Sequence, residues 1–175
     1  MRKIGTSLGV LVLVFGVLVS ALLAYAMILV RGFVFQTALL LLSMALLFFS
    51  AHPLSHYVAA RMYRVRVKYF FLGRSDFRRL GGTLGKAGKL LPTIGTKIDS
   101  DQIRKRSKNE RAFVFGSGAI VSSAVILIPL IFAFTRHVHF VALVLGTLFF
   151  LGNIVVEAQF STKVGDLAKM KRELS

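Results

Sequence analysis

The chain has 175 residues, of which 55% are hydrophobic, and its mean hydropathy is +0.72. It contains no cysteine, which excludes disulfides and thiolate metal ligands, so that any metal site must use histidine and carboxylate side chains. Lysine and arginine number 23 against 7 aspartates and glutamates, and the resulting net charge of +16 is typical of proteins that contact anionic lipid or nucleic acid.

Four apolar blocks predict four membrane-spanning helices. They run over residues 4–30, 33–60, 112–135 and 140–160. Each is long enough to cross a hydrocarbon core of about 30 Å at about 1.5 Å per residue. A cleaved signal peptide is the competing interpretation of the first block, because Ala24-Tyr25-Ala26 resembles a cleavage site. We expect a retained helix instead, since the apolar region of a signal peptide has only about 7–15 residues.

The distribution of basic residues predicts the orientation in the membrane. Residues 61–111 carry 15 lysines and arginines, Arg2 and Lys3 precede the first block, and the tail, residues 161–175, carries four. Each of the two hairpin loops carries only one arginine. Because loops rich in lysine and arginine stay in the cytoplasm, we expect a multi-pass protein of the plasma membrane with both termini cytoplasmic.

Residues 64–71 predict a half-buried strand at the start of the basic segment. Val65, Val67, Tyr69 and Phe71 alternate with basic or apolar neighbours and would share one face. Gly81-Gly82 predicts a turn before a second short strand, and Asp99 or Ser100 is the expected N-cap of a short helix that leads into the third span.

The charge of segment 61–111 has two interpretations. It is either a solvated face of the positive-inside kind, or a surface that binds anionic lipid headgroups at about 1 kcal/mol per basic residue. A nucleic-acid partner is not expected, because the segment has no aromatic-interleaved RNA-binding motif.

His52 and His56 are the strongest candidates for chemistry. They stand four residues apart at the end of the second span and so share one helix face. The topology brings Glu157 and Asp166 to a similar depth, and two imidazoles with one carboxylate form a recurrent catalytic zinc shell. The alternatives involve neither metal binding nor catalysis. The histidines could hydrogen-bond to headgroups and backbone, Glu157 could pair with a cytoplasmic cation, and Asp166 could cap a tail helix.

The segment 52–73 resembles the core of the site-2 protease family of intramembrane zinc metalloproteases. In that family a helix with the motif H-E-x-x-H continues through small residues and an arginine into a strand that ends at a glycine. Residues 52–61 and 65–73 follow this order, and Gly116-Ser117-Gly118-Ala119 resembles the glycine-rich start of the family's next span. The resemblance covers roughly residues 33–170.

The resemblance implies a zinc ion held by His52, His56 and Asp166, the last in the place of the family's third ligand. Asp166 does not stand in the family's Asn-Pro-Asp-Gly setting, and Pro53 replaces the glutamate that serves as general base. Loss of a general base typically slows catalysis by about 10²–10⁴-fold. We therefore expect metal binding with peptidase activity weakened or lost, and Glu157 is the candidate substitute base.

These observations together predict an all-α integral membrane protein, with one domain over 1–175 and a small cytoplasmic β/loop insertion between its second and third helices. The favoured function is that of a metalloprotease-like protein that binds membrane segments of a substrate or partner. The alternative is a non-enzymatic adaptor or accessory subunit whose basic segment docks on a partner or on anionic lipid. Transport is less favoured, because the charged groups cluster at one end and the chain has no internal repeat.

Overall fold

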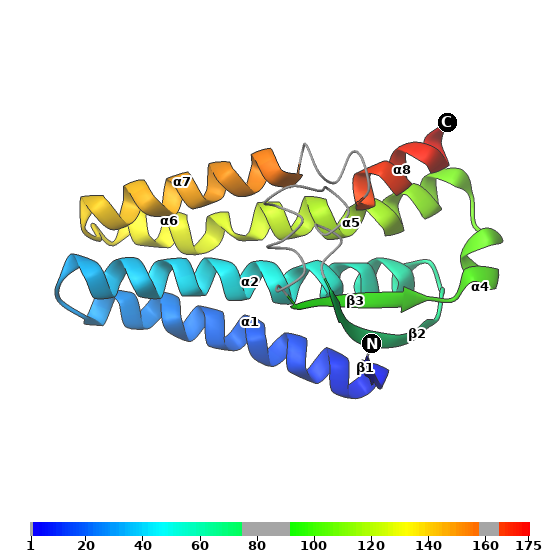
Figure 1. Ribbon diagram of the computed structural model, residues 1–175, viewed down its shortest axis with the longest axis horizontal. Helices are drawn as coiled ribbons and strands as arrows, with labels where there is room; N and C mark the ends of the chain where they lie inside the picture. The colour runs from blue at the N-terminus through cyan, green and yellow to red at the C-terminus, as the bar shows by residue number, and fades with distance from the viewer. Residues whose placement is uncertain (1, 75–91, 158–164) are drawn as a thin grey trace.

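The computed structural model describes residues 2–74, 92–157 and 165–175, and it is mostly helical, with a small sheet at one end of a helical bundle (Figure 1). Three helical segments are long and apolar enough to cross a membrane: α1 (Thr6–Leu29), α2 (Phe33–Met62), and α5 (Lys108–Val125) together with α6 (Leu127–Thr135). The apolar helix α7 (Phe140–Val156) is shorter. Three spans of the predicted four are thus supported, and the end of the fourth predicted block lies outside the described residues.

The packing of α1 on α2 is of the membrane type. The buried face of α1 carries small residues, among them Gly16 and Ser20. Ser20 Oγ donates to the carbonyl of Ser43 on α2 at 2.9 Å, and Ser43 Oγ donates to the carbonyl of Ser20 at 2.9 Å. Large apolar side chains point outward, as Leu18 and Leu22 do. Small and polar residues inside with bulky apolar residues outside suit helices surrounded by lipid.

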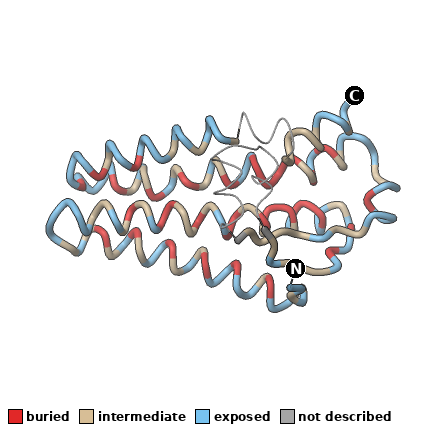
Figure 2. The backbone as a smooth tube through the Cα atoms, viewed as in Figure 1, coloured by how far each residue is buried: buried red, intermediate tan, exposed pale blue. Residues whose placement is uncertain are grey.

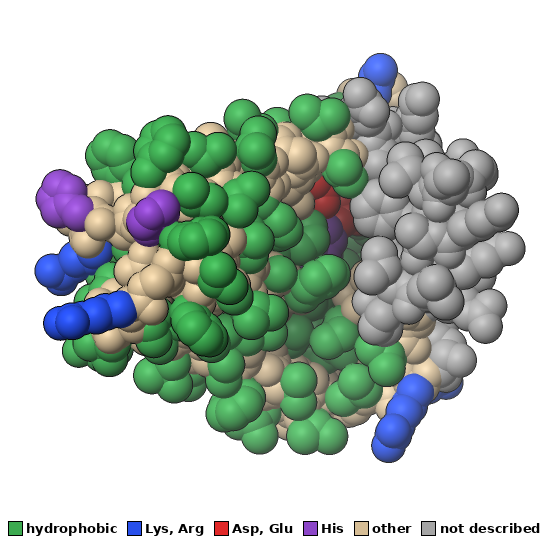
Figure 3. Space-filling model, turned by 60° about the vertical axis from the view of Figure 1, so that its left-hand side comes forward, with side chains coloured by type: hydrophobic (Ala, Val, Ile, Leu, Met, Phe, Trp, Pro, Cys, Tyr) green, Lys and Arg blue, Asp and Glu red, His purple; other side chains and the backbone are tan. Residues whose placement is uncertain are grey.

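The distribution of buried and exposed residues agrees with this pattern. Buried residues follow the inner sides of the helices and exposed residues the outer sides (Figure 2). Apolar side chains cover most of the described face in Figure 3, while lysine and arginine side chains gather toward its ends. The described face therefore has an apolar band with charged side chains toward its ends, as expected of a helical bundle surrounded by lipid.

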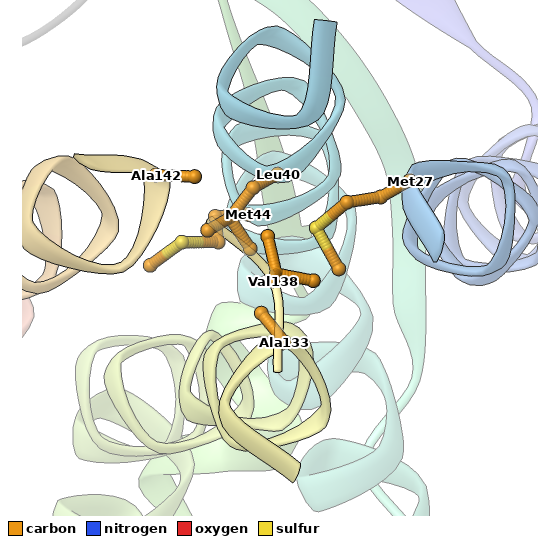
Figure 4. Close-up of a cluster of buried hydrophobic side chains, with 6 residues drawn as sticks. All are labelled: Met27, Leu40, Met44, Ala133, Val138 and Ala142. Carbon is orange, nitrogen blue, oxygen red and sulfur yellow. The ribbon is translucent and has the colours of Figure 1, made fainter. Parts of the chain in front are cut away.

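A buried cluster holds the helices together at the hairpin end. It consists of Met27 from α1, Leu40 and Met44 from α2, Ala133 from α6, Val138 from the loop before α7, and Ala142 from α7 (Figure 4). Because it joins four helices at the end where both hairpins turn, it fixes the position of α7 against α2.

A three-stranded antiparallel sheet, in the order β1-β2-β3, lies at the other end of the bundle (Figure 1). Its strands are β1 (Arg2–Ile4), β2 (Val67–Arg74) and β3 (Pro92–Ile98). The strand expected near residues 64–71 and a second short strand are both present, and the turn expected at Gly81-Gly82 lies outside the described residues. β1 was not predicted, because three residues are too few to show an alternating pattern and Ile4 was assigned to the first helix.

A β-bulge changes which residues of β2 face the core. The alternation predicted Tyr69 and Phe71 beside Val67, but the ladder is irregular between Val67 and Tyr69. A bulge inserts one residue and so shifts the alternation that follows. Phe70 is the buried residue instead, with 0% exposure. Its ring lies against Gly9, where an added Cβ would come within 2.2 Å, so the sheet is held directly on α1.

Two caps order the chain before the third span. Asp99 is the N-cap of α4 (Ser100–Arg104), and its side chain accepts from the backbone amides of Asp101 and Gln102, as the sequence predicted for residue 99 or 100. Ser107 and Glu110 form a capping box at the start of α5, a signature that the sequence analysis did not use.

The third span is interrupted between α5 and α6. Pro129 has no backbone N–H to donate to the carbonyl of Val125, four residues earlier, and α5 ends at that residue. The continuous helix predicted over 112–135 is therefore two helices that follow one another.

We expect Gly16→Leu to destabilise the packing of α1 on α2 by about 1–3 kcal/mol, because overpacking a tight interface forces side chains and backbone to shift. An added Cβ at Gly16 would lie 2.2 Å from Ser50 Oγ. Thermal unfolding in detergent, followed by circular dichroism, measures the effect. Gly152→Leu is the matched control, since an added Cβ there meets nothing within 4 Å. Equal stability of the two variants would contradict this packing.

Candidate metal centre

His52, His56 and Asp166 meet at the sheet end of the bundle. His52 Nε2 lies 2.9 Å from Asp166 Oδ2, and His56 Nε2 lies 3.0 Å from the same oxygen. One ligand atom from each residue lies within 4.8 Å of the others. Zinc bonds of about 2.0–2.1 Å in tetrahedral geometry place ligand atoms about 3.3 Å apart. The spacing of the three side chains thus fits a single ion.

The helix α2 positions both imidazoles. Their spacing of four residues places them on one face, and the ring centroids lie 5.2 Å apart. His52 is 19 positions beyond Phe33, or about 28 Å along the helix axis, which is close to the far boundary of a hydrocarbon core of about 30 Å. α2 is continuous through Pro53, although proline removes the backbone hydrogen bond to the carbonyl of Phe49.

Asp166 comes from the tail helix α8 (Asp166–Leu174), which packs against α5. Gly116 allows this approach, because an added Cβ there would lie 2.5 Å from Met170 Sδ. Arg111 Nε of α5 also donates to Glu173 Oε2 of α8. Asp166 is not the cap of this helix, the alternative left open by the sequence, since residue 165 holds the N-cap position and no side-chain cap bond is present.

The hydrogen bond of His56 fixes which ring nitrogen carries the proton. His56 Nδ1 lies 2.8 Å from the carbonyl oxygen of Val114. A carbonyl oxygen only accepts, so Nδ1 must be the donor. In the neutral ring Nε2 then has a lone pair, and this lone pair faces the Asp166 carboxylate.

The same holds for His52 through Ser122. The hydroxyl of Ser122 donates to the carbonyl of Gly118 at 2.7 Å, so its oxygen is left to accept from His52 Nδ1 at 3.2 Å. Metal-binding histidines are usually held in this way, with the second ring nitrogen donating to a neighbouring oxygen. Both imidazoles therefore present Nε2 lone pairs to one carboxylate oxygen.

Three acceptors that face one another repel unless positive charge lies between them. Protonation of both rings would supply it, but two imidazolium ions would then stand side by side around one carboxylate. A single divalent cation satisfies both nitrogens and the oxygen at once. The hydrogen-bond network around His52, His56 and Asp166 is thus one that could hold a metal ion.

Lys169 orients the carboxylate. Its Nζ lies 3.1 Å from Asp166 Oδ1, which leaves Oδ2 directed at the histidines as a single ligand atom. Burial raises the pKa of Asp166, whereas the positive charge of Lys169 lowers it and favours the ionised carboxylate, the form in which aspartate binds a metal.

Gly118 keeps the centre of the site open. An added Cβ at this position would lie 2.2 Å from His56 Nε2 and 2.9 Å from His52 Nε2, in the space between the ligand atoms. The side chain of His52 remains 25% exposed, against 11% for His56, so access is from the His52 side. Histidine and acidic side chains are visible in a recess among apolar side chains in Figure 3.

Sequence reasoning named the three residues that meet here but missed the residues around them. Gly118 was noted only as part of a glycine-rich stretch, and neither Ser122 nor Lys169 was singled out. Both have a local signal. Ser122 follows Gly118 by one helical turn, and Lys169 follows Asp166 by three residues on a helix, where side chains meet.

Glu157 stands apart from this group. It is the C-cap residue of α7, and among the described residues the ligand cluster contains only His52, His56 and Asp166. A catalytic role for Glu157 stays a prediction. Position 53 offers no acid or base, because the side chain of proline has no ionisable group. Pro53 is buried, and its carbonyl accepts from Thr96 Oγ1 at 3.1 Å.

Comparison of the chain with protein-family models, with curated proteins and with solved structures finds no match. The case for the site therefore depends on its geometry.

Gly118→Ala should abolish metal binding although it removes no ligand, because the new methyl group would occupy the space between the two Nε2 atoms. Metal content per chain, measured by mass spectrometry after purification without chelator, checks this. Gly152→Ala should retain the metal content of the parent, since the added methyl group meets nothing within 4 Å. Full metal content in Gly118→Ala would show that the ion does not lie between the histidines.

Proposed function

We propose that this chain is a membrane protein that binds one zinc ion through His52, His56 and Asp166, on the plan of a site-2-type intramembrane metalloprotease whose peptidase activity is weakened or lost. One observation carries the proposal. The two imidazole lone pairs and the carboxylate oxygen converge on one point, and each ligand is oriented by a hydrogen bond to another group.

The donor set favours zinc. Two imidazole nitrogens and one carboxylate oxygen do not suit magnesium or calcium, which prefer oxygen ligands. Three protein ligands with a further position left open are typical of catalytic zinc. When bound, zinc would supply a Lewis acid and lower the pKa of a coordinated water molecule. Two histidines and a carboxylate also occur in iron sites, so the metal analysis below must identify the element.

The residues of the chain supply binding and orientation but not proton transfer. His52 and His56 bind through Nε2, Lys169 holds the carboxylate in place, and Gly118 leaves room for a ligand oxygen. Pro53 stands where a base would receive the proton of water, and it cannot do so. Such a site holds a carbonyl group without hydrolysing its peptide bond, which suits a protein that binds membrane segments of a substrate or partner.

We also propose that the chain crosses the plasma membrane four times, with both termini in the cytoplasm. α7 has 17 residues, the lower limit of about 17–25 for a spanning helix. Arg31 and Arg136 mark the hairpin end, whereas the sheet end carries Arg2, Lys3 and the basic residues of segments 61–74 and 92–111. This asymmetry supports placing the metal centre near the cytoplasmic boundary.

We expect about one zinc ion per chain in the parent and none in His52→Ala/His56→Ala, because one remaining carboxylate cannot hold the ion. Elemental analysis of protein purified in detergent without chelator measures this. His137→Ala/His139→Ala is the matched control, since it removes the other two histidines of the chain, at the hairpin end. Absence of metal from the parent would contradict the proposal and favour the adaptor alternative, and iron in its place would contradict zinc.

Restoring a base should restore activity. We expect Pro53→Glu to cleave a membrane-segment peptide or casein at least about 10²-fold faster than Pro53→Ala, the range in which general bases contribute. Both variants regain the backbone N–H that proline lacks, so they differ only in the carboxylate. A fluorescence assay of peptide cleavage in detergent measures the rates. Equal rates in the two variants would contradict the assignment of residue 53 to the base position.

A further inference from the structure

The end of α2 is closed by two backbone hydrogen bonds. The amide of Val65 donates to the carbonyl of Ala60 at 2.8 Å, and the amide of Arg64 donates to the carbonyl of Arg61 at 3.0 Å. This pattern is a Schellman motif, in which the residue after the C-cap adopts a left-handed conformation and is usually glycine. Here that residue is Arg64, with a φ of 54°.

An arginine is unfavourable at this position. Its Cβ crowds the following carbonyl oxygen in the left-handed region, whereas glycine has no such contact. Non-glycine residues held in sparsely populated conformations cluster at functional sites. His137 follows the end of α6 in the same conformation, so the conformation alone assigns no role to Arg64, and any role must follow from its surroundings.

Arg64 lines an open surface cavity of about 420 Å³ together with Arg61, Val65, Arg66 and Gln102, and all of these residues except Val65 are exposed. The side-chain oxygen of Gln102 accepts from the backbone amide of Arg66 at 2.6 Å, so its NH₂ group is left to donate. The polar side-chain groups that remain in the lining are thus all donors, and three carry a permanent charge.

These charges are not neutralised within the described part of the chain. Its ion pairs involve neither Arg61, Arg64 nor Arg66. The nearby carboxylate of Asp99 is occupied elsewhere, because it caps α4 and lies 3.3 Å from Lys68 Nζ. A cavity with several unpaired guanidinium groups and an amide donor matches phosphate, whose oxygens accept paired hydrogen bonds from arginine.

The cavity lies just outside the headgroup layer. Arg61 is 28 positions beyond Phe33, or about 42 Å along α2. Measured from Phe33, a hydrocarbon core of about 30 Å and one polar layer of about 5–8 Å end at about 35–38 Å. The cavity therefore faces the membrane surface from the aqueous side, where a headgroup phosphate or a soluble phosphate can reach it.

We propose that the pocket formed by Arg61, Arg64, Arg66 and Gln102 binds a phosphate group, either that of an anionic lipid headgroup such as phosphatidic acid or that of a small phosphorylated molecule. The pocket shares no residue with the metal centre, and its occupation does not depend on zinc.

Two variants test the pocket without disturbing its frame. Arg64→Gly removes one charge and places the residue best suited to the left-handed conformation, so its melting temperature should equal or exceed that of the parent. Gln102→Glu keeps the oxygen that accepts from Arg66 but replaces the donor group with a carboxylate. Lys108→Gln is the control, since it changes the net charge by the same amount at the exposed start of α5, outside the pocket.

The measurement uses the full chain in phosphatidylcholine nanodiscs with and without phosphatidic acid, where native mass spectrometry counts bound lipid. Calorimetry with inorganic phosphate tests a soluble source. We expect Arg64→Gly and Gln102→Glu to weaken binding by about tenfold or more and Lys108→Gln to have little effect. Binding of phosphatidic acid alone identifies the headgroup, and binding of inorganic phosphate alone a soluble molecule. Binding of neither probe by the parent, or an equal loss in Lys108→Gln, would overturn the proposal.

Discussion

The meeting of two imidazole lone pairs with a carboxylate oxygen is the interaction on which the sheet end of the molecule depends. Without positive charge between them these groups repel, and with it they join the otherwise separate helices α2 and α8. The tail helix is amphipathic, and its apolar side, which includes Met170, packs on α5. It is also held by the contacts of Asp166 with the two histidines and by the ion pair of Arg111 with Glu173.

Small residues determine how closely the helices approach. In lipid, burial of apolar surface does not drive helices together, so packing and hydrogen bonds must do so. Gly16 and the Ser20–Ser43 pair hold α1 on α2, and Gly118 brings α5 against the histidines. α5 can therefore supply both the carbonyl of Val114, which accepts from Nδ1 of His56, and the hydroxyl of Ser122, which accepts from Nδ1 of His52. The close packing of α5 against α2 thus also fixes which ring nitrogen of each histidine carries the proton.

Local features were predictable from sequence and long-range ones were not. The apolar helices, the strand after Arg64 and the shared face of His52 and His56 follow from periodicity within a few residues. Asp166 lies 110 residues from His56, and only topology and a family resemblance connected the two. The bulge at Val67 and the pairing of β1 with β2 escaped prediction, because each depends on hydrogen bonds with a partner strand that a local pattern does not show.

Pro53 shows how the fold accommodates a proline beside the candidate ligands. A proline inside a helix removes one backbone hydrogen bond, yet α2 continues and both histidines keep their orientation. Packing compensates, because Pro53 is buried, its carbonyl accepts from Thr96 of β3, and the neighbouring His52 is held by Ser122. The geometry that brings His52, His56 and Asp166 together is therefore independent of any acid or base at position 53.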